Sequence, residues 1–328
     1  MGNYNVYLPS YSVGAGCYKE IPNVARRLGK KAVVIGGRTA IEKAKDALLD
    51  GIAGSDIQIV DFIVYGDDST YENVDKLVSD ERVRNADIIF GVGGGRAVDT
   101  CKVVADKLDK PLFTFPTLGS NCAAVTAICV MYNEDHTFKD YYYLDKPADH
   151  TFIDTQIIAE SPEDLFWAGI GDALSKEYEA VYSSQGVNLD HTPLMGVGIS
   201  KVCTEPLIKY GKKALEDCKN NTESEELKQV VLDIIISTGL VSNLTTTEND
   251  YYYNSSLAHA FYNGSTLVEG ARGLHGEVVS FGVLTLLTCA GEIQKRNEIA
   301  EFNKELGLPV CLADLGIDKS GIQTIVDK

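Results

Sequence analysis

Two histidines and one aspartate lie in sequence settings that suit a metal site. His259 lies in SLAHAFYNG, a small-residue helix, and His275 lies in GLHGEVVSFG, where an apolar helix begins. Asp172, in AGIGDALSKEYEA, interrupts small and apolar residues, and a buried carboxylate is costly unless it is paired or bound to a cation. Two imidazoles and a carboxylate form a three-ligand site with an open position for a substrate oxygen. Spacing alone leaves open that the histidines are ordinary core or capping residues.

A glycine-rich turn follows one of the apolar segments. Residues 93–102 read GGGRAVDTCK, in which Gly93, Gly94 and Gly95 precede a helix carrying Asp99 and Lys102. Consecutive glycines let the backbone approach a ligand closely, and the N-terminus of the next helix favours a pyrophosphate. The spacing therefore favours nucleotide binding, although a tight strand-to-helix turn is the simpler alternative.

An earlier turn, in VVIGGRTA, carries Gly37 and Arg38. A small residue followed by an arginine leaves room and charge for a 2′-phosphate, which favours NADP slightly over NAD. A solvated arginine on a loop explains the same pattern.

Charge and composition exclude several classes of partner. The chain of 328 residues carries 30 Lys and Arg against 47 Asp and Glu, a net charge of −17. This charge repels nucleic acid and anionic membranes, so we expect neither as a partner. We find no apolar stretch of membrane-spanning length and no signal peptide. The eight cysteines are scattered without a CxxC pair, which fits a cytoplasmic location.

The order of elements predicts two domains. Residues 1–160 alternate strand-like segments with helices, which indicates an α/β, Rossmann-like, doubly wound parallel sheet. The strands are expected at 31–35, 57–63, 86–92 and 112–115, and the helices at 40–49, 71–77 and 96–108. Residues 161–328 predict an all-α domain with helices at 163–180, 192–210, 225–242 and 278–295. We expect the active site between the two halves.

Five motifs in this order, GGGRAVDTCK, PTLGSNCAAVTAICVMY, GIGDALSKEYEA, AHAFYNG and LHGEVVSFG, resemble those of the iron-containing alcohol dehydrogenases, in their glycerol-dehydrogenase-like branch. The resemblance runs from about Asn5 to Leu315 and implies the dehydroquinate synthase-like fold of that family. It implies that Asp172, His259 and His275 hold a divalent metal, zinc rather than iron. It also implies NAD(P) contacts from Gly94, Gly95, Asp99, Lys102, Thr117, Thr126, Ile128 and Tyr132.

Three positions depart from the glycerol dehydrogenase pattern. Cys122 stands where those enzymes carry a polyol-binding aspartate, and a thiol cannot accept two hydroxyl hydrogen bonds. Lys176 lies four residues after Asp172 on the same helical face and is suited to a substrate carboxylate. Both features resemble the hydroxycarboxylate dehydrogenases of the family, although Lys176 is equally an exposed lysine pairing with a nearby Glu. Tyr262 stands where many relatives have a second histidine, either as a hydrogen-bond donor or as a packing residue.

We therefore expect a metal-dependent NAD(P)-linked dehydrogenase acting on a small alcohol, a polyol or a 2-oxo/2-hydroxy acid. We expect a homo-oligomer, and a chain that is short at its C-terminus relative to the family. A lyase of the dehydroquinate-synthase type and a glycerol-1-phosphate dehydrogenase are the nearest alternatives, but the basic residues for a phosphorylated substrate are not evident. A non-catalytic relative that binds nucleotide or metal is the third.

Overall fold

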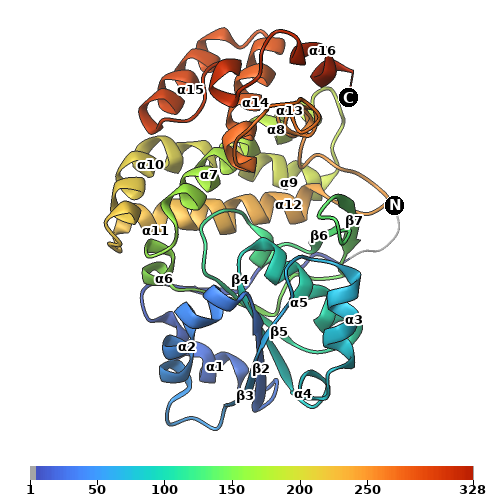
Figure 1. Cartoon of the computed structure of the whole chain (residues 1–328), viewed down its shortest axis with the longest axis vertical. Helices are drawn as coiled ribbons and strands as arrows, with labels where there is room; N and C mark the ends of the chain where they lie inside the picture. The colour runs from blue at the N-terminus through green and yellow to red at the C-terminus, as the bar shows by residue number, and fades with distance from the viewer. Residues whose placement is uncertain (1–4, 328) are drawn as a thin grey trace. The chain divides into compact units, whose positions relative to one another are not determined.

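The first part of the chain folds around a six-stranded sheet (Figure 1). The structure is a computed structural model that describes residues 5–327. The strands lie in the order β1-β8-β5-β4-β2-β3, and all pairings are parallel, which confirms the predicted doubly wound sheet. Their bounds are β1 (Tyr11–Val13), β2 (Lys31–Gly36), β3 (Gln58–Val64), β4 (Ile88–Gly93), β5 (Leu112–Pro116) and β8 (His150–Ile153).

Helices cover both faces of this sheet, and a separate antiparallel hairpin follows β5. The hairpin consists of β6 (Ile128–Tyr132) and β7 (Phe138–Tyr143). The helices are η1 (Cys17–Glu20), α1 (Ile21–Ala25), α2 (Arg38–Ile52), α3 (Tyr71–Ser79), α4 (Glu81–Arg84), α5 (Gly95–Lys107), η2 (Ala123–Val125) and α6 (Thr155–Ala159). β1, β8 and the hairpin were not predicted from the sequence.

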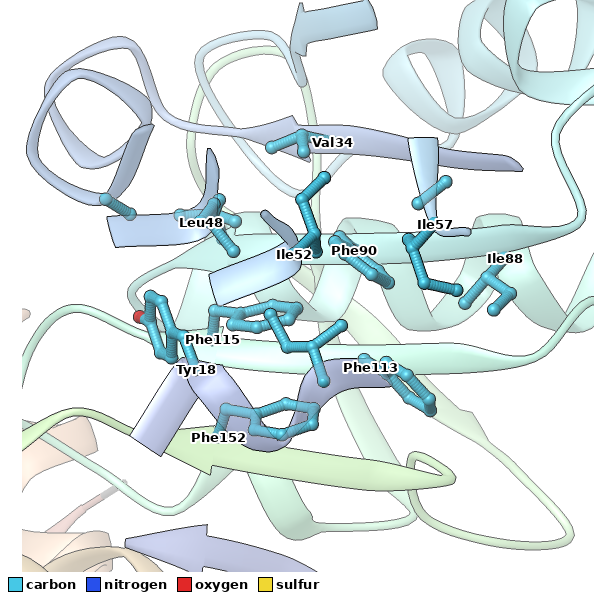
Figure 2. Packing of buried hydrophobic residues seen from close by; sticks show 14 of the residues in the cluster. Tyr18, Val34, Leu48, Ile52, Ile57, Ile88, Phe90, Phe113, Phe115 and Phe152 are labelled. Atoms are coloured by element: carbon cyan, nitrogen blue, oxygen red, sulfur yellow. The ribbon is translucent and has the colours of Figure 1, made fainter. Parts of the chain in front are cut away.

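The two faces of the sheet have separate cores because successive side chains of a strand point in opposite directions. In β2, Val34 packs into one core and Val33 into the other. The core on the side of α1 and α2 is rich in aromatic residues, and Figure 2 shows it. Its aromatic members are Tyr18, Phe90, Phe113, Phe115 and Phe152. Strands buried on both faces read as continuous apolar runs, which explains why the central strands were predicted correctly.

The second part of the chain is helical, as predicted. Its helices are α7 (Glu163–Ala173), α8 (Ser175–Ser183), α9 (His191–Ser200), α10 (Thr204–Lys219), α11 (Glu225–Leu232), η3 (Asp233–Ser237), α12 (Thr238–Thr245), α13 (Leu257–Ser265), α14 (His275–Cys289), α15 (Ile293–Leu306), η4 (Leu312–Leu315) and α16 (Gly321–Val326). Three of the predicted helices are wrong as continuous elements: 192–210, 278–295 and 163–180, the last of which is divided at Leu174 between α7 and α8. The first is interrupted between α9 and α10, and the second ends before Gly291, whose φ of 77° is left-handed.

One continuous helical segment, Glu225–Thr245, contains a π-helical turn at η3. Its length and its mean hydropathy of 1.3 satisfy the requirement for crossing a membrane, which corrects the expectation that no such stretch exists. Because 67% of the apolar window is buried inside the protein, the segment has the character of a core helix.

Contacts divide the chain into two compact units. The first unit runs to Ser161 and also includes Asn220–Glu223, and the second comprises Pro162–Lys219 and the chain from Ser224 onward. Two hydrogen bonds attach this four-residue loop to α6 in the first unit. The Thr155 hydroxyl donates to Oε1 of Glu223 at 2.9 Å, and the Gln156 amide donates to the carbonyl of Asn221 at 3.3 Å. The boundary expected from the sequence placed this loop within the helical domain.

Candidate metal centre and dinucleotide-binding segments

Three helices of the second unit bring Asp172, His259 and His275 together. Asp172 lies near the end of α7, His259 in the first turn of α13, and His275 is the first residue of α14. One ligand atom from each lies within 4.8 Å of the others. Oδ1 of Asp172 is 3.5 Å from Nε2 of His259 and 3.3 Å from Nε2 of His275. Three residues distant in sequence thus present two imidazole nitrogens and one carboxylate oxygen to a common point.

Close packing of α7 on α14 sets the distance between Asp172 and His275. Each helix has a glycine next to its ligand, Gly171 on α7 and Gly276 on α14. A Cβ atom on Gly171 would lie 2.5 Å from the carbonyl oxygen of Gly276. Side chains at this crossing would force the two helices apart, so the glycines are a condition for the convergence of the ligands.

The electrostatics of the three residues fit a divalent cation. Oδ1 of Asp172 is shielded from solvent and, within the described chain, has no hydrogen bond of good geometry. Burial alone would raise the pKa of Asp172, but the two imidazoles outweigh it and hold the pKa well below its usual range. Burial alone would lower the pKa of His259, but Glu179 and Asp172 raise it to about 10. The site attracts positive charge, which is what a metal centre requires.

Two further candidate residues of the second unit, Lys176 and Tyr262, have defined partners. Lys176 is only 7% exposed, and its Nζ donates to Oδ1 of Asn254 at 2.7 Å. The alternative that Lys176 is an exposed lysine paired with a Glu is therefore wrong. The rings of Tyr262 and His275 meet edge to face, with centroids 4.3 Å apart, so Tyr262 packs against the imidazole. Asn254 was missed at the level of sequence because only tertiary folding brings it to Lys176.

In the first unit, the glycine turn lies where β4 passes into α5. Gly93 has a φ of 145°, which a residue with a side chain rarely adopts. Gly94 is the N-cap of α5, and Gly95 is its first residue. Thr117, after β5, donates its N–H to the carbonyl of Gly93 at 3.3 Å. The turn therefore has the geometry expected for backbone contact with a phosphate at a helix N-terminus.

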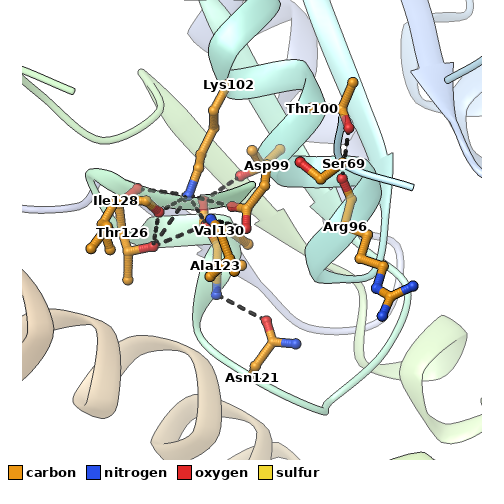
Figure 3. Close-up of polar contacts among 12 residues, drawn as sticks. Ser69, Arg96, Asp99, Thr100, Lys102, Asn121, Ala123, Thr126, Ile128 and Val130 are labelled. Atoms are coloured by element: carbon orange, nitrogen blue, oxygen red, sulfur yellow. Dashed lines mark hydrogen bonds and ion pairs between the residues drawn. The ribbon is translucent and has the colours of Figure 1, made fainter. Parts of the chain in front are cut away.

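Asp99 and Lys102 on α5 are buried and bonded within the protein, as Figure 3 shows. Nζ of Lys102 lies 2.8 Å from Oδ1 of Asp99. The ammonium also reaches the carbonyl oxygens of Ala123, Thr126 and Ile128, at 2.9, 3.1 and 2.7 Å. Burial alone would lower the pKa of Lys102, but the Asp99 carboxylate outweighs it and raises the pKa. The pair fixes the segment that contains the predicted contacts Thr126 and Ile128.

The remaining predicted cofactor residues occupy different parts of the first unit. Gly37 is the N-cap of α2, and Arg38 is its exposed first residue. Tyr132, at the end of β6, lies under the Arg96 guanidinium, whose Cζ is 4.7 Å from the ring centroid. Arg96 was not singled out from the sequence, although it directly follows the three glycines. Cys122 is the partly buried residue that precedes η2.

A Rossmann-like unit followed by a helical unit with an Asp-His-His constellation defines a class of metal-dependent, nucleotide-linked dehydrogenases. The family model of the iron-containing alcohol dehydrogenases matches residues 9–155. Glycerol dehydrogenase from Thermotoga maritima is 31% identical over 94% of this chain and 83% of its own length. Hydroxycarboxylate dehydrogenase A from Escherichia coli is 29% identical, over 91% and 80%. The crystal structure of a probable glycerol dehydrogenase from Sinorhizobium meliloti has a TM-score of 0.82 at 26% identity, covering 99% of this chain and 90% of the other.

The chain belongs to the iron-containing alcohol dehydrogenase family, in its glycerol-dehydrogenase-like branch. It is accordingly an oxidoreductase, and membership implies NAD(P) and a divalent metal.

Proposed function

We propose that this metal-dependent NAD(P)-linked dehydrogenase interconverts a small 2-oxo acid and the corresponding 2-hydroxy acid. The first unit binds the dinucleotide through Gly37, Gly93–Gly95 and the segment from Thr117 to Tyr132. The second unit holds the metal with Asp172, His259 and His275, and it binds the substrate carboxylate with Lys176.

The buried environment of Lys176 is the main observation that supports a 2-oxo or 2-hydroxy acid as the substrate. A buried ammonium needs a countercharge or full hydrogen bonding, because removing it from water is costly. Among residues 5–327, Lys176 forms no ion pair, and its bond to the neutral Asn254 amide leaves donor capacity for an anion. A substrate carboxylate supplies the missing negative charge.

Cys122 supports the same choice. It stands where the family places an aspartate that binds a polyol, so a thiol takes the place of a carboxylate at this position. Replacing that carboxylate removes a repulsion toward an acidic substrate and removes an acceptor for polyol hydroxyls. One of the related proteins is named a hydroxycarboxylate dehydrogenase, which is consistent with this substrate.

The mechanism assigns a role to each side chain. A divalent cation supplies Lewis acidity toward the substrate oxygen, and NAD(P) supplies or accepts the hydride. Asp172, His259 and His275 hold the cation, and Lys176 orients the substrate by its carboxylate. Tyr262 limits rotation of the His275 ring by packing against it. Asp99 and Lys102 hold the loop that carries the cofactor contacts Thr126 and Ile128, in addition to any contact of their own with the cofactor.

The test is a substrate panel combined with one substitution. Purified enzyme is assayed with 2-oxobutyrate, 2-oxoglutarate, simple aldehydes and glycerol. Lys176→Gln is expected to lower kcat/KM for the oxo acids roughly 100-fold, by removing a buried charge pair, while aldehydes of similar size lose far less. Lys212→Gln, an exposed position, is the control. Glycerol oxidation at a higher kcat/KM than that of any 2-hydroxy acid, or equal losses for acids and aldehydes, overturns the proposed substrate.

We further propose that the cofactor is NADP and that the metal is zinc. Arg38 beside Gly37 favours NADP over NAD, and Arg38→Ala should raise KM for NADPH more than KM for NADH. Two imidazoles and a carboxylate suit zinc, and also ferrous iron. We propose zinc, and metal analysis of enzyme purified without added metal distinguishes the two.

We also propose that the protein is a homo-oligomer located in the cytoplasm. It is proposed to bind neither nucleic acid nor membranes. All eight cysteines are free thiols, which suits a reducing compartment. Cell fractionation and light scattering of the purified protein test these two points.

A further inference from the structure

Glu179, on α8, is a buried carboxylate whose two oxygens are both engaged. Its side chain is 0% exposed. Oε1 accepts the backbone N–H of Ser256 at 2.7 Å and that of His259 at 3.0 Å. Oε2 lies 2.5 Å from Nδ1 of the His259 ring. One carboxylate therefore contacts both the backbone and the side chain of a candidate metal ligand.

The backbone contacts make Glu179 a cap for α13. Ser256 is the N-cap residue of this helix, but its own side chain makes no capping hydrogen bond. Glu179 supplies the acceptor instead, from a different helix, and its negative charge lies at the positive end of the α13 dipole. The first turn of α13, which contains His259, is thereby fixed to α8.

The side-chain contact has a chemical consequence for the imidazole. A carboxylate at Nδ1 favours the tautomer that carries its proton on Nδ1, which leaves the lone pair on Nε2. Nε2 is the atom that lies 3.5 Å from Oδ1 of Asp172. Carboxylates in this position orient metal-binding histidines and increase their basicity in many proteins.

We propose that Glu179 is a positioning residue of the metal centre, which sets the tautomer and orientation of His259 and fixes the helix turn that carries it. This inference rests on the proposed function, since it assumes that the three residues bind a metal. A purely structural cap would stabilise α13 without affecting metal affinity, so affinity is the quantity that separates the two roles.

The primary test is zinc affinity of the metal-stripped full-length protein, measured by competition with a chromophoric chelator. Glu179→Gln keeps one oxygen for the backbone N–H groups, but its amide donates to Nδ1 and thereby favours the proton on Nε2. We expect the Kd for zinc to rise 10- to 100-fold, with an unchanged circular dichroism spectrum. Glu177→Gln is the matched control, because Glu177 lies on the same helix and its Oε1 pairs instead with Nζ of Lys295, 3.9 Å away. This variant should bind zinc as the wild type does.

Two backgrounds locate the effect on His259. In His275→Ala, adding Glu179→Gln should cost the same further factor in zinc affinity, because His259 is still present. In His259→Ala the further cost should disappear. Equal zinc affinity of the wild type and Glu179→Gln, or an undiminished cost in His259→Ala, overturns the inference alone. No saturable zinc binding by the wild type overturns the proposed function together with it.

A second measurement avoids dependence on a variant that fails to fold. Nitrogen-15 NMR of the zinc-loaded wild type distinguishes a protonated from a metal-bound ring nitrogen. We expect His259 to carry its proton on Nδ1 and to bind through Nε2. The opposite tautomer overturns the proposed role of Glu179.

Discussion

A Cβ atom on Gly276 would overlap the carbonyl oxygen of Ala168. The two atoms would lie far closer than van der Waals contact allows, and Ala168 lies one turn before Asp172 on α7. Gly276 directly follows His275 on α14, so the two helices approach each other closely beside two of the candidate metal ligands.

Gly276→Ala should therefore destabilise the protein and weaken zinc binding together. The added methyl group must displace backbone, and overpacking of this kind costs about 1–3 kcal/mol. Thermal unfolding and chelator competition measure the two effects. Gly198→Ala is the control, because a Cβ atom at this position in α9 would have nothing within 4 Å, and it should be neutral or slightly stabilising. Unchanged zinc affinity in Gly276→Ala would contradict the packing argument.

Removal of the candidate metal ligand His275 should abolish turnover while leaving the dinucleotide bound. Loss of Lewis-acid stabilisation worth several kcal/mol corresponds to a decrease in kcat/KM of about 1000-fold. Cofactor affinity of His275→Ala, measured by NAD(P)H fluorescence, should stay within about twofold of the wild type, because the predicted cofactor residues all lie in the first unit. Full activity of His275→Ala in chelator-treated buffer would exclude the metal mechanism.

Lys102→Met should destabilise the first unit, because it leaves Asp99 as an uncompensated buried charge. Breaking a buried ion pair by removing one partner costs about 3–5 kcal/mol, and denaturant unfolding measures the loss. Lys107→Met, on the same helix but partly exposed beside Asp75, should cost less than about 1 kcal/mol. The double variant Asp99→Asn/Lys102→Met should recover part of the stability that Lys102→Met loses. If it recovers none, the unpaired Asp99 carboxylate is not the cause of the loss.

Asp233, in the π-helical turn, should make stability depend on pH. It is 2% exposed, and burial raises its pKa to about 8, an effect that the nearby Ser237 hydroxyl offsets only in part. Between the unfolded pKa near 4 and the folded value, the folded state retains a proton that the unfolded state releases, so stability falls as pH rises through this window. The slope for one group is at most about 1.4 kcal/mol per pH unit.

Asp233→Asn removes this contribution. Its free energy of unfolding, relative to the wild type, should increase from pH 5 to pH 8 and then level off. Urea unfolding at several pH values measures the difference, and parallel profiles for the two proteins would show that Asp233 does not titrate as described.

The central strands could be predicted because their apolar runs are local in sequence. β2 and β4 are buried on both faces, and glycines end each run, so few other structures fit those segments. β1 and β8 contain only three and four residues, and Ser10 and Ser12 bond His150 across them. Such short strands exist because of pairing between distant segments, which no local pattern reveals.

The candidate metal centre likewise contains features that local sequence reveals and features that depend on tertiary contacts. Asp172 stands out as a carboxylate among small residues, but only the family resemblance joined it to His259 and His275. Glu179 was missed, although it follows Asp172 by seven residues and the sequence predicted a single helix over 163–180, in which that spacing places both residues on one side. That spacing was the available signal. Its contacts with Ser256 and His259 depend on a fold that brings α8 to the start of α13.

The loop Asn220–Glu223 makes the chain pass between the two units three times, after Ser161, after Lys219 and after Glu223. Neither unit is therefore a single uninterrupted stretch of polypeptide. A fragment ending at Ser161 would lack Glu223, the acceptor of the Thr155 hydroxyl. A fragment starting at Pro162 would contain the loop but would lack Thr155, to which the loop is bonded. Cooperative unfolding of the whole chain, rather than two independent transitions, is the natural outcome of this interleaved connectivity.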